Sequence, residues 1–325
     1  MIKETSEGRA TTHLPAVMIA GGTALISGIS VFVNSYGVHA ISNASVYTTA
    51  KNLVAALILA AVMLAVPSIR KTLRTLPTSQ TVPNLDADES HQRSANIARL
   101  VGFAYVGIIG GGLAFALFFN GLARSSAEPS AFLHDTLVVW VAILALPLLR
   151  EHLSGWNLAA IGLLIGGQVV EVGGIGHLVV GEGAVLVLTA TVLWAIEIIV
   201  AKRLLASSTP GQIALVRMGI GAVVLLIYVA STGGLGALVS LGGNQLGWVV
   251  LTGGLLALYV GTWLVALSRA RALDVTSILV ASVIVTALLQ ALASGSLAIP
   301  NVAGLALIGA GAGAVLLGWP KRVTT

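Results

Sequence analysis

Cysteine is absent from the 325 residues, and charged side chains make up only 9% of them. Without cysteine the chain has no disulfide framework and no thiolate metal site. With so little charge it lacks the surface of a soluble domain, which carries about 25% charged residues. The glycine-rich phosphate loop and the His-Glu-x-x-His metallopeptidase signature are also missing. We therefore expect no cofactor, no metal site and no catalytic residues, and the chain is not expected to be an enzyme.

Apolar residues make up most of the chain. Hydrophobic residues account for 57% of it, and the mean hydropathy is +0.98. A helix that crosses a bilayer needs about 20 apolar residues, and the period-two alternation of a membrane barrel is missing. The sequence predicts an all-α integral membrane protein with ten transmembrane helices, at residues 16–38, 46–66, 100–122, 130–149, 155–174, 183–201, 211–231, 247–267, 275–293 and 300–319.

Lysine and arginine fall almost entirely on one side of this predicted topology. With the N-terminus in the cytoplasm, 14 of the 17 lie in cytoplasmic segments, Arg124 lies outside, and Lys51 and Arg217 lie within spans. The positive-inside rule then predicts an inner or plasma membrane protein with cytoplasmic tails at 1–15 and 320–325. Loop cations facing the inner leaflet explain the net charge of +5 without nucleic acid. Residues 1–13 lack the pattern of a signal peptide, so we expect the first span to be retained.

Two halves of the chain have similar layouts, 16–174 and 183–319. The stretches 44–51 and 210–217 each begin a span and end on a cation, and 156–162 and 300–306 begin the fifth and tenth spans alike. Because five is odd, the second copy enters the bilayer inverted, which is the structural basis of alternating access. The polar, proline-containing segment 67–99 is predicted to be a flexible cytoplasmic loop rather than a domain.

Several short stretches occur in an order typical of one family. They are residues 113–123 with Ser125-Ser126-Ala127, then Leu149-Arg150-Glu151-His152-Leu153-Ser154, then Leu193-Trp194-Ala195. Together with the cations of spans two and seven they resemble the drug/metabolite transporter superfamily, in its ten-helix EamA-type branch, over about residues 16–319. The resemblance implies two inverted five-helix repeats and export of metabolites or amino acids. The chain departs from the family near Val138, where a proline is usual, and at Gly295 and Ser296, which stand where a counterpart of Glu151 belongs.

Five ionisable side chains lie within the predicted spans: Lys51, His134, Asp135, Glu197 and Arg217. Such residues cost at least about 2.5–3.5 kcal/mol on insertion and usually face a cavity or a partner. Lys51 and Asp135 lie level near the outer side, and Glu197 and Arg217 lie level near the inner side. Either each pair closes a gate or contacts substrate, or the cations snorkel to headgroups while the acids lie at hydrated helix ends. Asp135, Glu197 and His134 are the candidates for proton coupling. Because His134 and Asp135 are adjacent, their side chains point about 100° apart on a helix and cannot both face one cavity.

Aromatic residues divide into two groups by depth. Trp140 and Trp194 lie near the centres of their spans, and Tyr259 lies within about one turn of the centre of its span. These deep rings either face lipid or line a midplane substrate site, to which Asn34, Asn120 and Gln290 add hydrogen bonds. The tryptophans at span ends are typical of the interfacial belt; they are Trp156, Trp248 and Trp319.

Glycine is abundant, with 38 residues. Gly162 and Gly166, like Gly309 and Gly313, are four residues apart, and such pairs either pack helices within the chain or form a homodimer. The run 110–112 in span three either admits a neighbouring helix or ligand or lets its helix bend.

These patterns predict a secondary active transporter that moves a small metabolite by alternating access. The solute is an amino acid, a nucleobase-like molecule or an amphipathic drug-like molecule, export is the expected direction, and proton coupling stays open. The expected partners are this solute and the lipid bilayer, with the protein a monomer or a homodimer. Two alternatives remain, a channel or sensor and a polytopic lipid-modifying enzyme. The scattered polar residues disfavour the enzyme, and the inverted repeat disfavours the channel.

Overall fold

The computed structural model describes residues 13–65, 86–125, 127–171, 174, 181–295 and 299–318. Every regular element in these ranges is helical, as the sequence predicts. Eight of the helices are long and apolar enough to cross a membrane. Two further crossings are shorter, namely α8 with 17 residues and the apolar part of α15 from Val302 to Leu317. The chain is therefore a multi-pass membrane protein with ten crossings.

Five crossings form the first half. The third crossing is a continuous helix in which residues 105–113 adopt the wider π-helical winding, and the fourth is two helices joined at Thr136. The elements of this half are α1 (His13–Ala40), α2 (Ala44–Ala65), α4 (Asp86–Ala104), η1 (Tyr105–Leu113), α5 (Ala114–Leu122), α6 (Ala127–Asp135), α7 (Leu137–Leu149) and α8 (Gly155–Glu171).

The second half repeats this order. Thr209 caps its second crossing through a reciprocal capping box with Gln212, directly before Pro210, which suits the first turn of a helix. The ninth crossing, like the fourth, is two helices, joined here at Ala281. The elements are α9 (Glu182–Leu204), α10 (Pro210–Ser231), α11 (Leu235–Val239), α12 (Gly243–Arg269), α13 (Ala272–Val280), α14 (Ser282–Ser294) and α15 (Ile299–Leu317).

The predicted loop at 67–99 is partly helical. From Asp86 onward the chain forms α4, which continues into the third crossing, whereas residues 66–85 lie outside the described residues. The prediction of a loop at 86–99 is wrong because polarity alone does not end a helix. This segment contains no proline after Pro83 and includes good helix formers such as Ala95 and Ala98.

The helices of the two halves pack in a matched pattern. The first crossing of each half packs on the third crossing of the other half: α1 packs on α12, and α9 packs on α5 and η1. The second crossings do the same, since α2 packs on α12 and α10 packs on η1. α1 also packs on α13 and α14, as α9 packs on α6 and α7. Three contacts join equivalent crossings of the two halves: α2 with α10, α7 with α13, and α8 with α15. This is the packing of two inverted five-helix repeats.

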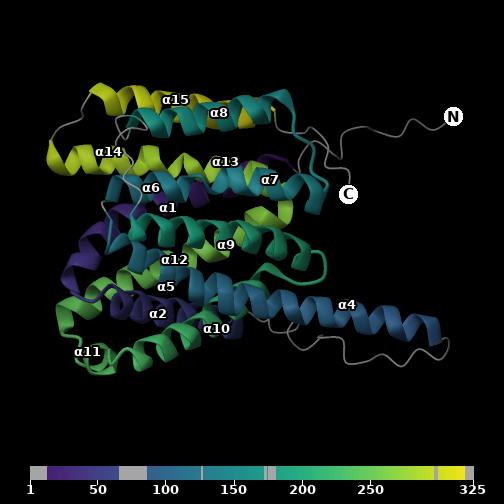
Figure 1. The fold of residues 1–325 in the computed structure, drawn as a ribbon, viewed down its shortest axis with the longest axis horizontal. Coiled ribbons are helices and arrows are strands. Elements are labelled where there is room, and N and C mark those ends of the chain that lie inside the picture. The colour runs from purple at the N-terminus through teal and green to yellow at the C-terminus, as the bar shows by residue number, and fades with distance from the viewer. Residues whose placement is uncertain are drawn as a thin grey trace.

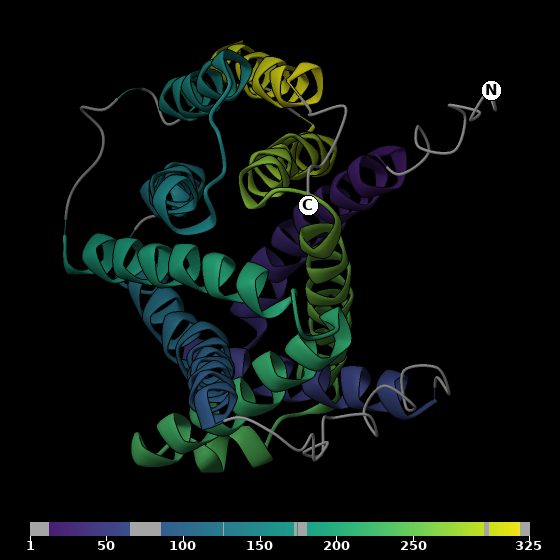
Figure 2. The same ribbon diagram turned by 90° about the vertical axis from the view of Figure 1, so that its right-hand side faces the viewer.

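The pictures show the same arrangement in space. In Figures 1 and 2, α8 and α15 lie side by side at one edge of the bundle. α2 and α10 lie toward the opposite edge, and the broken fourth and ninth crossings lie between the α8–α15 pair and the rest. The helices with the most intramembrane charge therefore lie away from the α8–α15 edge.

The two broken crossings match in detail. Each consists of a helix of nine residues, one joining residue, and a helix of 13 residues. Each 13-residue helix ends on a left-handed residue, Arg150 at φ 53° and Gly295 at φ 69°. Sequence gives no local sign of the breaks, since neither Thr136 nor Ala281 adjoins a proline. The breaks are thus a property of the packed repeat.

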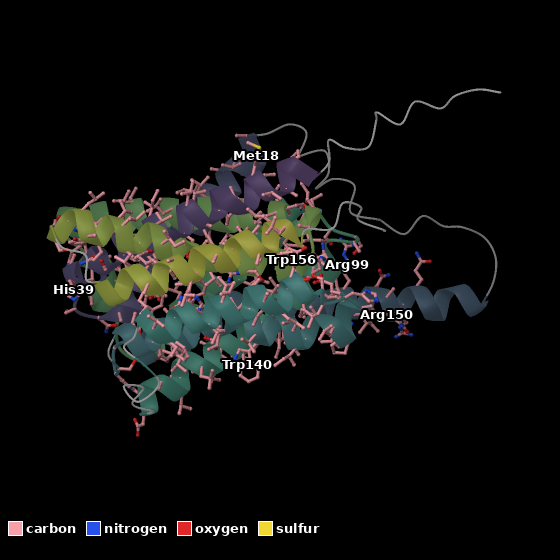
Figure 3. All side chains as sticks on the ribbon, turned by 90° about the horizontal axis from the view of Figure 1, so that it is seen from above. Met18, His39, Arg99, Trp140, Arg150 and Trp156 are labelled. Atoms are coloured by element: carbon pink, nitrogen blue, oxygen red, sulfur yellow. The ribbon has the colours of Figure 1, made fainter. Side chains whose placement is uncertain are left out.

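The bundle has one end rich in cations. Figure 3 shows Arg99, Arg150 and Trp156 toward one end and His39 toward the other. Arg203 belongs to the first end, because its guanidinium donates to the carbonyl oxygen of Leu148. We call this the basic end.

Glycines let α8 and α15 approach closely, but they are not the glycines four residues apart that the sequence singled out. A Cβ on Gly167 would lie 2.7 Å from the carbonyl oxygen of Gly304, and a Cβ on Gly304 would lie 2.8 Å from that of Gly167. Gly162, Gly166 and Gly313 face open space instead. The prediction that these three glycines pack helices within the chain is therefore wrong. Gly167 is adjacent to Gly166, and adjacent positions on a helix point about 100° apart, so only Gly167 faces α15. Dimerisation stays a prediction.

Candidate functional site

Glu197 of α9 and Arg217 of α10 form an ion pair inside the bundle. Arg217 Nε donates to Glu197 Oε1 at 2.5 Å, and Nη2 donates to Oε2 at 3.1 Å. The side chains of Arg217 and Glu197 are 6% and 1% exposed. The guanidinium Cζ also lies 5.3 Å from the ring centroid of Phe115 and 5.5 Å from that of Trp263. Two parallel hydrogen bonds fix both charges in one geometry.

Glycines of the third crossing make room for this pair. A Cβ on Gly110 would overlap the Glu197 carboxylate, and one on Gly111 would overlap the carbonyl oxygen of Arg217. Trp194 Nε1 donates to the carbonyl oxygen of Gly110 at 3.0 Å, within the π-helical stretch. The run 110–112 was predicted either to admit a neighbouring helix or ligand or to let its helix bend. In the structure these glycines let the neighbouring helices α9 and α10 approach closely.

Lys51 occupies the equivalent place in the first repeat. It is the eighth residue of α2, as Arg217 is the eighth residue of α10, and both helices have 22 residues. Its Nζ donates to Asn34 Oδ1 at 3.0 Å and lies 4.4 Å from the ring centroid of Phe119. Lys51 is 4% exposed. Unlike Arg217, it forms no ion pair with any described residue.

Asp135 lies elsewhere, so the predicted cluster of Lys51 with Asp135 is wrong. Asp135 Oδ2 accepts a hydrogen bond of 2.6 Å from Gln168 Nε2 of α8. α6, which carries Asp135, packs mainly on α9, whereas α2 packs mainly on α12 and α10. Equal depth was therefore not enough to bring the two charges together. Depth follows from position along a helix, but the facing direction depends on packing.

His134 points into an aromatic cluster. Its ring centroid lies 5.1 Å from that of Phe118 and 5.3 Å from that of Trp194. Its buried Nδ1 has no hydrogen-bond partner among the described residues. His134 and Asp135 thus face different neighbours, although both directly precede the break at Thr136.

The other predicted site residues lie around these groups. Asn120 Nδ2 donates to the Ala116 carbonyl oxygen at 2.8 Å and to Ser45 Oγ at 3.4 Å. Trp140 and Tyr259 are half-buried against the main core. Gln290 is exposed on α14, which does not suit the binding role predicted for it. At the span ends, Trp156 is 51% exposed and Trp248 stacks on Tyr36, while Trp319 lies outside the described residues.

At the basic end, polar contacts join the two halves. Arg271 pairs with Asp274 through Nε–Oδ2 at 2.6 Å and Nη2–Oδ1 at 2.7 Å. Arg271 Nη1 also donates to the carbonyl oxygen of His152, and Asn157 Nδ2 donates to Asp274 Oδ1 at 3.2 Å. The segments 150–157 and 269–274 are therefore tied together at this end.

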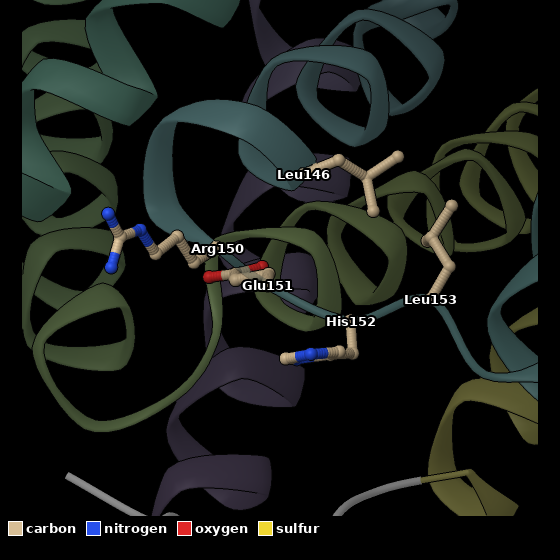
Figure 4. Close-up of a pocket in the computed structure, with 5 residues that line it drawn as sticks. All are labelled: Leu146, Arg150, Glu151, His152 and Leu153. Atoms are coloured by element: carbon tan, nitrogen blue, oxygen red, sulfur yellow. The ribbon is translucent and has the colours of Figure 1, made fainter.

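Glu151 is part of the same junction and caps α13. Its Oε1 and Oε2 accept hydrogen bonds of 2.7 Å and 3.2 Å from the backbone N–H groups of Ala272 and Leu273. Burial raises the pKa of the Glu151 carboxyl, and these two hydrogen bonds oppose the rise. Beside it lies a hollow of about 560 Å³, lined by Leu146, Arg150, Glu151, His152 and Leu153 (Figure 4). None of the side chains predicted to bind substrate lines this hollow.

Gln168 and Asp274 were not predicted as site residues from the sequence. Gln168 is uncharged, so it is not among the ionisable side chains within the spans. Asp274 lies at the boundary of a predicted span, where an acid is unremarkable. The favourable place of an acid in the first turn of a helix was the one available signal for Asp274.

Comparisons with known proteins agree with this architecture. The EamA-like transporter family matches residues 14–170 and 181–317, which is one match for each repeat. Among curated proteins, none matches the chain. Solved structures do match, 28 chains in all. One of them, titled "Crystal structure of protein", has a TM-score of 0.71 at 16% identity, covering 93% of this chain and 98% of the other. That likeness shows the fold alone, whereas the family match covers both repeats, and the chain belongs to the EamA-like transporter family.

Proposed function

We propose that the chain exports a small amphipathic metabolite by alternating access, as a secondary transporter of the inner or plasma membrane. The observation that carries this proposal is the matched packing of two inverted halves, each with a broken crossing, at Thr136 and Ala281. Discontinuous helices near the midplane commonly form the binding sites of inverted-repeat transporters. The basic end then faces the cytoplasm, where Lys and Arg concentrate.

A continuous series of rings supports a binding region between the two buried cations. Phe119 lies beneath Lys51, its ring centroid is 6.4 Å from that of Phe115, and Phe115 lies beneath Arg217. Trp194 contacts Phe115 from α9 at 5.3 Å. Aromatic faces bounded by a few fixed polar groups suit an amphipathic solute.

The polar junction at the basic end supports a gate on that side. Segments 150–157 and 269–274 come from different halves, so their mutual hydrogen bonds must break before a passage opens between them. In this proposal the described conformation is closed toward the cytoplasm. Release of Glu151 from α13 accompanies opening.

Saturable counterflow tests the transport function. Purified protein in proteoliposomes preloaded with unlabelled solute is expected to accumulate the labelled form transiently, with solutes taken from pools of amino acids, nucleobases and amphipathic drugs. Liposomes without protein are the control. Flux that does not saturate and shows no counterflow would indicate a channel, and a change in lipid headgroups would indicate a lipid-modifying enzyme. Either result contradicts the proposal.

Asp135 is the acid that we propose carries a coupling proton. Glu197 is held by two hydrogen bonds to Arg217, whereas Asp135 accepts one from a neutral amide beside the helix break. Asp135→Asn should therefore abolish transport driven by a pH gradient and leave counterflow intact, because counterflow needs no driving ion. Glu182→Gln, at an exposed acid on α9, is the matched control. Undiminished pH-driven transport in Asp135→Asn excludes this role, and the same measurement on His134→Gln tests the histidine.

A further inference from the structure

The two repeats place a cation at the same position but compensate it differently. Asn34 lies six residues before the end of α1, and Glu197 lies seven before the end of α9. Each is the hydrogen-bond acceptor for the cation on the next crossing, Lys51 or Arg217. In the first repeat a neutral amide thus stands where the second has a carboxylate.

Backbone packing confirms that these are equivalent places. A Cβ on Gly111 of the third crossing would overlap the carbonyl oxygen of Arg217. A Cβ on Gly253 of the eighth crossing would lie 2.9 Å from the carbonyl oxygen of Lys51. Each cation is therefore held where a glycine lets a neighbouring crossing approach. The difference between the repeats lies in the charge of the acceptor, not in the geometry.

The Asn34 amide is oriented by its own hydrogen bonds. Its Nδ2 donates to the Ser30 carbonyl oxygen at 2.7 Å and to Ser30 Oγ at 3.1 Å, which points Oδ1 toward Lys51. The same Oδ1 accepts from the Tyr47 hydroxyl at 2.7 Å. A lysine ammonium has three donors, and Asn34 occupies one of them. Among the described residues no other group accepts from the buried ammonium of Lys51 and no carboxylate pairs with it, so it retains donors and an uncompensated charge.

A buried charge without a partner is costly in a low-dielectric interior. The Phe119 ring offsets part of this cost through a cation–π contact, but it supplies no negative charge. We propose that the transported solute supplies it, and that Lys51 binds a single carboxylate of that solute. A phosphate would bring a second negative charge for which the described residues around Lys51 offer no second cation, so one carboxylate matches the site. This assignment rests on the proposed transport function, because the ligand is taken to be the transported solute. Binding of a carboxylate to Lys51 can nevertheless be measured without transport.

Ligand-induced thermal stabilisation of the purified full-length protein tests the assignment. The probes are acetate, benzoate and L-phenylalanine, each compared with its amide: acetamide, benzamide and L-phenylalaninamide. Phenyl phosphate tests the phosphate alternative. A carboxylate is expected to raise the melting temperature of the wild type where its amide does not. Lys51→Gln should weaken that binding by about tenfold to 100-fold, which is the range of one charge-assisted hydrogen bond.

Asn34→Asp gives a second, independent readout. It places a carboxylate where the second repeat has Glu197, so it should raise the melting temperature without any probe and weaken carboxylate binding at least about tenfold. Asn244→Asp, at an exposed position on α12, is the matched control and should change neither value. If Lys51→Gln proves unstable, Asn34→Asp alone decides the question.

Three results overturn the assignment. They are equal stabilisation by each carboxylate and its amide, unchanged carboxylate binding in Asn34→Asp, and stabilisation by phenyl phosphate alone. Counterflow in proteoliposomes separates this failure from failure of the proposed function. A wild type that shows counterflow while lacking carboxylate selectivity refutes only the role of Lys51.

Discussion

The pair of Glu197 with Arg217 makes a strong prediction about stability, because both groups are almost fully buried. Breaking a buried ion pair by removing one partner costs about 3–5 kcal/mol, since the other charge is left without compensation. Removing both charges leaves nothing uncompensated and is often neutral. Glu197→Met and Arg217→Met should therefore each be severely destabilising, and the double variant should lie much closer to the wild type.

Methionine suits both positions. It is flexible enough to fill the space left by either side chain, and at position 217 it retains apolar contact with the rings of Phe115 and Trp263. The double-mutant cycle then reports the interaction between the two charges rather than the loss of packing. We expect a coupling free energy of several kcal/mol, above the 0.5–3 kcal/mol that is typical of contacting residues.

Reversible unfolding of the purified protein in detergent, titrated with SDS, measures these free energies. Arg93→Met, at an exposed cation on α4, serves as the control and should change the free energy of unfolding by no more than about 0.5 kcal/mol. Additive losses in the double variant would refute the reasoning. So would single variants that cost less than about 1 kcal/mol, which is the value of a solvent-exposed pair.

Three further substitutions test other features. Gly111→Ala should lower the free energy of unfolding by about 1–3 kcal/mol, because the added Cβ forces α10 away from the third crossing. Gly219 faces open space, so the control Gly219→Ala should not lower the free energy of unfolding. The same SDS titration compares the two variants. Burial raises the pKa of Glu151, so its contribution to stability is present below the ordinary carboxyl pKa and is lost as pH rises through the raised value. Glu151→Gln should flatten this part of the pH dependence of the melting temperature, and an unchanged profile would contradict it. Arg150→Gly should raise stability by about 1 kcal/mol, because φ 53° is strained for arginine; a lower melting temperature would show that the arginine side chain outweighs this strain.

The crossings and the placement of Lys51 and Arg217 can be predicted from sequence because they depend on apolar length and on position along a helix. The pairing of Glu197 with Arg217 follows from complementary charge at equal depth on consecutive crossings. The partners of Lys51 and Asp135 could not be found in this way. Asn34 and Gln168 are neutral, and the direction in which a side chain faces is decided by which helices pack together.

The breaks in the fourth and ninth crossings were also beyond sequence reasoning. Ala281 follows an apolar run, and Thr136 follows His134 and Asp135 in a span that is apolar overall, so hydropathy predicts an uninterrupted helix in both places. The glycines between α8 and α15 show the same limit. A spacing of four residues describes Gly162 and Gly166 well, but only packing reveals that Gly167 and Gly304 form the contact.

The exchange of an amide for a carboxylate between the repeats has an energetic consequence for a transporter that alternates between two mirror-related states. A perfectly duplicated protein would populate both states equally when empty. Here one half keeps a cation neutralised by a carboxylate and the other a cation held by an amide oxygen and an aromatic ring, so under the proposed alternating access the two empty states would differ in free energy. In this proposal the unloaded carrier has a preferred resting side, and the asymmetry that sets this preference comes from the difference between Asn34 and Glu197.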